Sequence, residues 1–143
     1  MRRLAVPLLA VVLAASACAK KADGPVEVAD AFADAYFRRA DQEKAKEYTA
    51  LGASTMLEDE IGRVAQLRKD GYGPAEAGGQ VTLKRGEPVP RDQRVRVPYE
   101  VTVQVDSTQT IRDADVELTQ IGGVWKVVRI GLRSREAPAA HEQ

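Results

Sequence analysis

Residues that commonly build reactive or metal-binding sites are scarce in this chain of 143 residues, which holds one cysteine, Cys18, and one histidine, His141. A single cysteine excludes an internal disulfide framework and a cysteine-rich metal site. A single histidine excludes a multi-histidine metal centre and weakens schemes in which histidine activates a nucleophile. Aromatic residues make up 5% of the sequence, so the core must rest mainly on Val, Leu, Ile and Ala.

An excess of charge of one sign is also lacking. Lys and Arg total 21, and Asp and Glu total 21, which gives a formal net charge of zero. Proteins that bind nucleic acid through its phosphates are normally basic, so this balance argues against nucleic acid as a partner. The length fits one domain of ordinary size and leaves no room for a second.

The start of the chain carries a secretion signal. Arg2 and Arg3 precede a run of twelve uncharged residues, Leu4–Ala15, and small residues occupy positions 15–17. Twelve residues in a helix span about 18 Å, which is too short for a hydrocarbon core of about 30 Å. A basic start, a short apolar stretch and small residues are typical of a signal peptide. We therefore expect residues 1–17 to be a signal peptide.

The lone cysteine follows this segment directly. The sequence Ala15-Ser16-Ala17-Cys18 resembles the lipobox of bacterial lipoproteins, although Ala15 stands where Leu is usual. The resemblance implies that Cys18 is acylated and anchors the protein to a membrane. Because Ala19 and not Asp follows Cys18, the resemblance also implies an outer-membrane location facing the periplasm in a Gram-negative host. The alternatives are a plain signal peptide with an incidental Cys18 and a buried apolar cysteine.

The rest of the chain changes composition half way. After residue 17, 13 of 17 alanines lie before residue 78, and 11 of 14 valines lie at or after residue 81. Alanine favours helices and valine favours strands, so this order predicts an α+β domain with helices first. We expect a tether over residues 18–24, a single domain over 25–133 and a flexible tail over 134–143, which includes His141.

Three helices are expected in the first half. Pro25 fits the first turn of a helix whose apolar positions recur at helical spacing up to Ala40. Asp41 caps a second helix through Tyr48, with Leu51 among its apolar residues. Gly52 is expected to interrupt the helical segment. Thr55 and Glu58 have the spacing of a capping box at the start of a third helix. That helix carries an apolar stripe and ends at Gly71, before a loop over 71–79. The stripe consists of Leu57, Ile61, Val64 and Leu67.

About four antiparallel strands are expected in the second half. A loosely patterned strand contains Val81, Leu83 and Val89, and alternation of apolar and polar residues over 94–105 predicts a long, half-buried strand. Pro98 interrupts this strand and predicts a bulge or bend, because proline cannot donate to the ladder. A turn at Asp106-Ser107 leads to a third strand over about 110–121.

The last hairpin has a specific predicted register. Gly122-Gly123 is a two-residue hairpin signal, and the final strand runs from Val124 to about Arg133. This pairing places Leu118 opposite Val127 and Gln120 opposite Trp125. Three side chains of the final strand are expected on the face opposite Trp125, namely Val124, Val128 and Ile130. An exposed apolar face there would favour dimerisation.

Two segments, VEVADAFADAYFRRADQEKAKEYTAL and GGVWKV, together with the helix-then-strand order, resemble the nuclear-transport-factor-2-like superfamily over residues 25–133. Its relatives include ketosteroid-isomerase-like and SnoaL-like proteins. The resemblance implies a curved antiparallel sheet that wraps a helix to form a cone with a cavity. Some members bind or isomerise small molecules there, whereas many are interaction modules or dimers, so the fold does not decide the function.

The aromatic residues Phe32, Tyr36, Tyr99 and Trp125 are the candidates to line such a cavity. Tyr36 and Tyr99 also lie on apolar stripes, where a packed tyrosine with a satisfied hydroxyl is the ordinary explanation, and Trp125 is equally a core or rim aromatic. An isomerase needs a buried carboxylate facing a hydrogen-bond donor, and no Tyr–Asp pair in the sequence can be matched to that motif. We therefore assign no catalytic residue, metal ligand or cofactor.

Charged residues of the strands form a second pattern. Arg94, Arg96, Arg129 and Arg133 make a basic strip on one sheet face, which we interpret as solvated and paired with Glu100 and Glu117. The sequence as a whole predicts a lipid-anchored cell-envelope protein with a non-catalytic binding or interaction domain, whose partner is a second copy or another envelope protein. The alternative is a small-molecule carrier or isomerase-type enzyme that uses the cavity.

Overall fold

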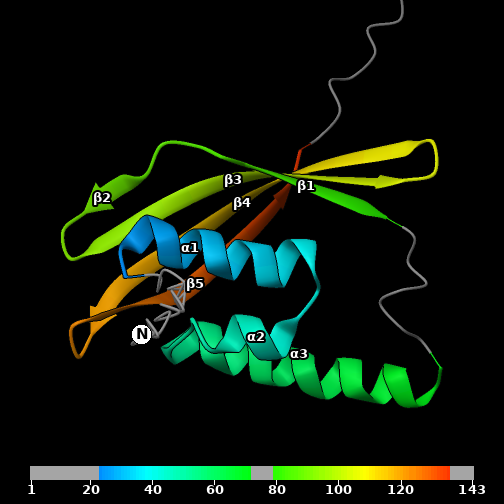
Figure 1. Cartoon of the computed structure of the whole chain (residues 1–143), viewed down its shortest axis with the longest axis horizontal. Helices are drawn as coiled ribbons and strands as arrows, with labels where there is room; N and C mark the ends of the chain where they lie inside the picture. Colours follow the sequence, from blue (N-terminus) through cyan, green and yellow to red (C-terminus); the bar gives the residue numbers. More distant parts are fainter. Residues whose placement is uncertain (1–22, 72–78, 136–143) are drawn as a thin grey trace, which may run out of the picture.

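Helices cover one face of an antiparallel sheet in the computed structural model, which describes residues 23–71 and 79–135 (Figure 1). The helical elements are α1 (Pro25–Ala33), the π-helical turn η1 (Asp34–Arg38), α2 (Gln42–Lys46) and α3 (Leu51–Lys69). The strands are β1 (Gln80–Arg85), β2 (Val89–Arg91), β3 (Arg94–Val105), β4 (Thr108–Ile121) and β5 (Val124–Ser134). The predicted α+β class, with helices before strands, is confirmed. The expected signal peptide, Cys18 and His141 lie outside the described residues.

The first two helices follow the sequence signals. α1 begins at Pro25, and its buried face contains Phe32 and Ala33. Asp41 caps α2, because its side chain accepts a hydrogen bond from the backbone N–H of Lys44 at 3.0 Å. The predicted start of the third helix is wrong.

α3 begins at Leu51 and includes Gly52, which was expected to interrupt the chain. Thr55 lies inside this helix, where its hydroxyl donates to the carbonyl of Leu51 at 3.4 Å instead of capping an end. Leu51 is 68% exposed, although it was expected among the apolar residues of the second helix. Within the predicted stripe only Leu57 is buried, because the second half of α3 projects away from the sheet (Figure 1).

The sheet has five strands where about four were expected. Its order is β1-β3-β4-β5, and β2 pairs with the same edge of β3 as β1. The extra strand arises because the expected first strand divides into two. The β1 ladder ends where Arg85 pairs with Tyr99, and the β2 ladder begins where Val89 pairs with Arg96.

The predicted bulge at Pro98 is wrong. Pro98 stays in register with Asp115 of β4, and on its other edge it faces the gap between β1 and β2. Its carbonyl points into that gap and accepts a hydrogen bond from the N–H of Gly86 at 2.8 Å. The amide nitrogen of a strand residue points the same way as its carbonyl, so the missing N–H costs no ladder bond here.

The β4–β5 hairpin has the predicted register. Gly122 and Gly123 both have positive φ, as a two-residue hairpin turn requires. Leu118 pairs with Val127, and Gln120 pairs with Trp125. The irregularity of the sheet lies in this ladder, where the register shifts between Glu117 and Leu118.

The shift makes Val128 the extra residue of β5. It also reverses the alternation of β5, so Ile130 pairs with the buried Val116 and packs against the core. The expectation that Ile130 faces away from Trp125 is therefore wrong.

The core lies between the helices and the inner face of the sheet. Side chains without exposed surface come from α1, α3, β3, β4 and β5. They include Phe32, Leu57, Val97, Val116, Leu118 and Val127. The segment that joins α2 to α3 closes the outer edge of β5, because Val127 exchanges backbone hydrogen bonds of 2.9 Å with Tyr48 and Ala50. No described helix is long and apolar enough to cross a membrane.

Candidate functional site

The four aromatic candidates occupy different places in the fold. Phe32 has no exposed surface, stacks on Tyr36 with ring centroids 5.4 Å apart, and therefore belongs to the packed interior. Tyr36 is half-buried in η1, whereas Tyr99 in β3 is 4% exposed. Trp125 is half-buried near the β4–β5 turn, where it lines a rim hollow of about 500 Å³ with Val95 and Gly123.

Tyr99 links the sheet to α1. Its hydroxyl donates to Oδ1 of Asp30 at 2.8 Å, and Oδ2 of the same carboxylate forms an ion pair with Arg85 of β1. Burial, together with the hydrogen bond to Asp30, raises the pKa of Tyr99 above its ordinary value. The phenol therefore stays protonated and serves as a donor that ties three elements together.

Tyr36 forms a second link, between η1 and α3. Its hydroxyl donates to Oε2 of Glu60 at 2.8 Å, and the Gln42 side chain donates to the other oxygen of Glu60 at 3.3 Å. Burial and the contact with Glu60 raise the pKa of Tyr36. Both inner tyrosines thus have satisfied hydroxyls, as the packing explanation requires.

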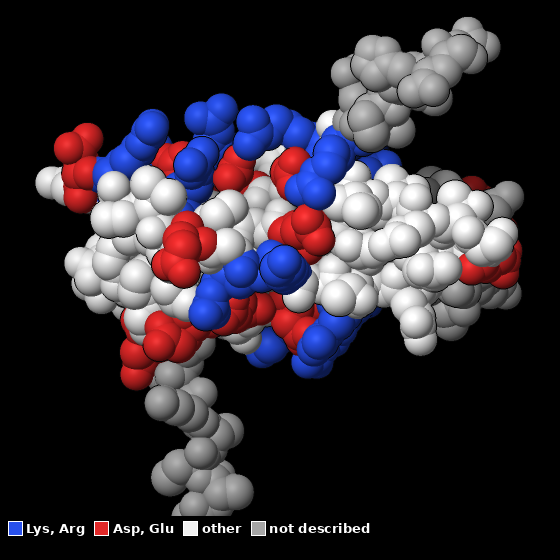
Figure 2. Space-filling model, turned by 90° about the horizontal axis from the view of Figure 1, so that it is seen from above, with Lys and Arg blue, Asp and Glu red and all other residues white. Residues whose placement is uncertain are grey.

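The outer face of the sheet is rich in charge, and none of the described helices covers it (Figures 1 and 2). Cross-strand pairs share a face, so the register brings Arg96, Glu117 and Arg129 into one row across β3, β4 and β5. Figure 2 shows Lys and Arg side chains gathered along one side with Asp and Glu between them, while the right end is mostly uncharged.

Arginine side chains dominate a groove on this face. We define the arginine groove as the two hollows that share Arg91, Arg96 and Glu117, of about 530 and 390 Å³. The arginines that line these hollows come from β2, β3 and β5. They are Arg91, Arg94, Arg96, Arg129 and Arg133. Three acids, Asp92, Asp115 and Glu117, also line the groove, so arginines exceed acids by two.

Some of these charges pair with one another. Arg94 contacts Glu117 at 2.5 Å, and Arg133 contacts Asp115 at 2.8 Å. Of the two acids expected to pair with the strip, Glu117 does so through Arg94, whereas Glu100 pairs with Arg135 instead. Asp115 is a further partner of the strip through Arg133. Each pair is substantially exposed, and such pairs contribute little to stability. The groove is better explained by what it could bind than by what it adds to folding.

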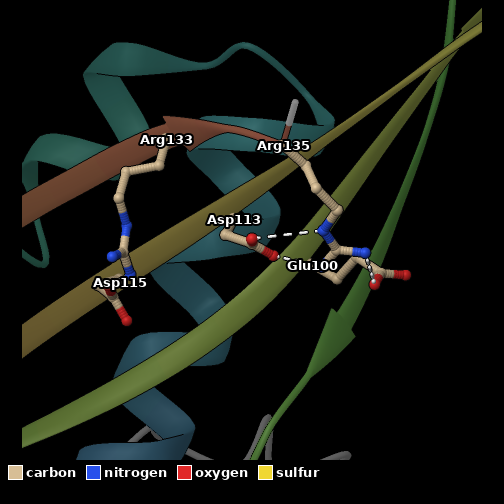
Figure 3. Close-up of polar contacts among 5 residues, drawn as sticks. All are labelled: Glu100, Asp113, Asp115, Arg133 and Arg135. Atoms are coloured by element: carbon tan, nitrogen blue, oxygen red, sulfur yellow. Dashed lines mark hydrogen bonds and ion pairs between the residues drawn. The ribbon is translucent and has the colours of Figure 1, made fainter. Parts of the chain in front are cut away.

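A second polar cluster lies beside the groove (Figure 3). Arg135 contacts Glu100 at 3.0 Å and Asp113 at 2.5 Å, which joins the residue after β5 to β3 and β4. The guanidinium of Arg135 holds the pKa of Asp113 below its ordinary value. Sequence reasoning assigned Arg135 to a flexible tail, and no local pattern signals this contact because its partners are distant in sequence. It also missed Arg91, which lies on a three-residue strand too short to show alternation.

Within residues 23–71 and 79–135, no group of three or more His, Cys, Asp or Glu side chains has an arrangement that could hold a metal ion. Guanidinium groups present planar forks of N–H donors, so the chemistry that the arginine groove offers is the binding of anions.

No protein-family model and no curated protein matches the chain. Solved structures resemble it in fold. One, from Thiobacillus denitrificans and described as a calcium/calmodulin-dependent protein kinase type II association domain, has a TM-score of 0.54 and 12% identity, over 80% of this chain and 97% of that one. Another, Bd1075 of Bdellovibrio bacteriovorus, has a TM-score of 0.51 and 12% identity, over 79% of this chain and 40% of that one. At these identities the likeness concerns the fold alone, and it supports a nuclear-transport-factor-2-like α+β architecture.

Proposed function

We propose that this chain is a lipid-anchored protein of the bacterial cell envelope whose single domain is a non-catalytic binding module. The anchor rests on the sequence, in which a short apolar run after Arg2 and Arg3 ends in small residues and Cys18. Acyl chains on Cys18 would hold the domain at a membrane, since each buried methylene contributes about 0.8 kcal/mol. In a Gram-negative host, the site would be the periplasmic side of the outer membrane.

The observation that carries the binding proposal is the contrast between the two faces of the sheet. The inner face is closed by the helices and by packed side chains such as Phe32 and Leu118, which have no exposed surface. The outer face lacks a helical cover and contains the arginine groove. A partner or ligand therefore meets the outer face first, and the chemistry offered there is charged.

The enzyme alternative has one feature in its favour. The Tyr99–Asp30 pair, at 2.8 Å, combines a hydroxyl donor with a carboxylate, which is the combination that an isomerase requires. However, the Asp30 side chain is 45% exposed and already forms an ion pair with Arg85. A general base needs a free carboxylate in a protected site, so the pair is better explained as a link between α1 and the sheet.

The partner remains a proposal with two forms, a second copy of this chain or another envelope protein. An apolar sheet face would have favoured self-association, but the outer face is charged, which favours a partner of complementary charge.

Photo-cross-linking in the envelope tests whether the outer face contacts a partner. A photoreactive residue at Thr119, on the outer face, should capture a partner, whereas the same residue at Gln66, on exposed α3, should not. Equal capture from both positions, or from Gln66 alone, would contradict the proposal.

A further inference from the structure

Two arginines face each other across the short ladder that forms one wall of the groove. Arg91 of β2 pairs directly with Arg94 of β3. Like charges opposite each other in an antiparallel pair destabilise the sheet, so this pairing is unfavourable by itself. Arg94 is compensated by Glu117, but among the described residues no acidic side chain forms an ion pair with Arg91.

Two carboxylates, Glu117 and Asp115, pair with arginines of the groove. Glu117 lies between Arg96 and Arg129 in the sheet register, yet its ion pair is with Arg94. The second carboxylate, Asp115, pairs with Arg133 and lies 3.9 Å from Nε of Arg96, beyond hydrogen-bond distance. Acidic partners are thus already engaged at the two ends of the groove, and its middle holds excess positive charge.

A buried donor marks this middle. Nε of Arg96 is shielded from solvent and has no hydrogen-bond acceptor within the described structure. Buried polar atoms are normally hydrogen-bonded, so an unsatisfied guanidinium N–H needs an explanation. Arg96 lines both hollows of the groove. Its neighbour Arg129 forms no ion pair with an acid among residues 23–71 and 79–135.

The floor of the groove is open at Gly131 of β5. This glycine does not have a positive φ, and a Cβ placed on it would meet Asp115 at an ordinary contact distance of 3.9 Å. Neither backbone conformation nor crowding therefore requires a glycine. A glycine inside a strand is often found where a ligand approaches the backbone closely.

We propose that the arginine groove binds a phosphate-bearing ligand, with Arg91, Arg96 and Arg129 as its principal contacts. A phosphate group carries up to two charges and accepts bidentate hydrogen bonds from guanidinium groups. Among the described residues Arg91 and Arg129 form no ion pair, and Arg96 has only the contact of 3.9 Å with Asp115. Three such arginines match a doubly charged group better than a singly charged carboxylate. The hollows also fall within the size range of small-molecule sites. This inference rests on the proposed binding function and names its ligand class.

Isothermal titration calorimetry of the purified protein with inorganic pyrophosphate tests the site. Arg96→Gln and Arg129→Gln should each weaken binding about tenfold or more, because each removes charged hydrogen bonds. Gly131→Val should also weaken it, since it fills the floor without changing charge. The matched control is Arg68→Gln, which removes the same charge from exposed α3 and should change affinity less than twofold. Equal losses in Arg96→Gln and Arg68→Gln, or a wild-type protein that binds neither pyrophosphate nor vesicles of phosphatidylglycerol, would overturn the proposal.

Phosphate groups reach a protein from soluble molecules or from lipid headgroups, and the Cys18→Ser chain separates these sources. Sedimentation with vesicles of phosphatidylglycerol, but not phosphatidylcholine, that is lost in Arg96→Gln would assign the site to a lipid headgroup. Pyrophosphate binding without vesicle binding would assign it to a soluble ligand. If neither probe binds but the Thr119 cross-link persists in Arg96→Gln, the phosphate site is refuted while the binding module stands.

Discussion

The hydrogen bond from Tyr99 to Asp30 provides a measurable test of the role of the inner tyrosines. Tyr99→Phe removes the hydroxyl and keeps the ring, which is 4% exposed in the wild-type protein. A hydrogen bond to a charged group contributes about 1.5–3 kcal/mol. Because Asp30 is 45% exposed and keeps Arg85, water can replace the lost donor, so we expect the lower end of the range, about 1.5 kcal/mol. That loss corresponds to a fall in Tm of about 5 °C for a domain of this size.

Urea denaturation measures this loss, and Tyr48→Phe is the matched control. Tyr48 is half-buried and packs against the core, but its hydroxyl has no hydrogen-bond partner in the described structure. A double-mutant cycle with Asp30→Asn isolates the pair. A coupling energy near zero, with equal stability of Tyr99→Phe and Tyr48→Phe, would refute the argument that Tyr99 is a structural link.

The same pair has a predicted pH dependence. The pKa of Tyr99 is raised in the folded protein, so the group stabilises the fold fully below the unfolded value of about 10. This contribution is lost as the pH rises through the folded pKa. Spectrophotometric titration at alkaline pH should therefore show that Tyr99 ionises only with unfolding. Ionisation near pH 10 in the folded protein would contradict the burial and bonding described for it.

Three further predictions address the core, the surface and the anchor. Leu118→Ala should destabilise the domain by about 3 kcal/mol in urea denaturation, because the side chain has no exposed surface, whereas Leu132→Ala, at a residue 48% exposed, should cost less than about 1 kcal/mol. The pKa of Asp113 is lowered by Arg135, so its contribution is present above about pH 4 and lost as the pH falls through the folded pKa. Asp113→Asn should therefore lose less stability than the wild type between pH 7 and pH 3, and an unchanged acid profile would count against the cluster. Cys18→Ser should release the protein from the membrane fraction, and membrane-bound mutant with unchanged acyl labelling would rule out the lipoprotein proposal.

Much of the fold is predictable because its signals are local. Proline at the start of α1, Asp41 at the cap of α2, and the Gly122-Gly123 turn each act within a few residues. The failures involve tertiary context. Pro98 fits a regular strand because its unbonded edge meets a gap between two other strands, and that gap cannot be read from β3 itself.

The candidate site was only partly predictable for a related reason. The expected basic strip contains four of the five arginines of the groove, and the expected pairing with Glu117 is present for Arg94. Strict alternation along β5 would place Arg129 and Arg133 on the face of Trp125, and the register shift between Glu117 and Leu118 turns them to the outer face. The sequence did not indicate that β2 adds Arg91 opposite Arg94, nor that Arg96 keeps a buried, unsatisfied donor. Both features depend on the register between strands and on packing, which a single sequence pattern does not specify.

Native mass spectrometry of the protein purified from a bacterial envelope tests most directly whether the outer face, and not the interior, is the binding surface. We predict a bound ligand or partner that is lost in the Arg96→Gln, Arg129→Gln double variant and retained in Tyr99→Phe. Retention in the arginine variant, together with loss in Tyr99→Phe, would contradict the account and place the function between the helices and the sheet.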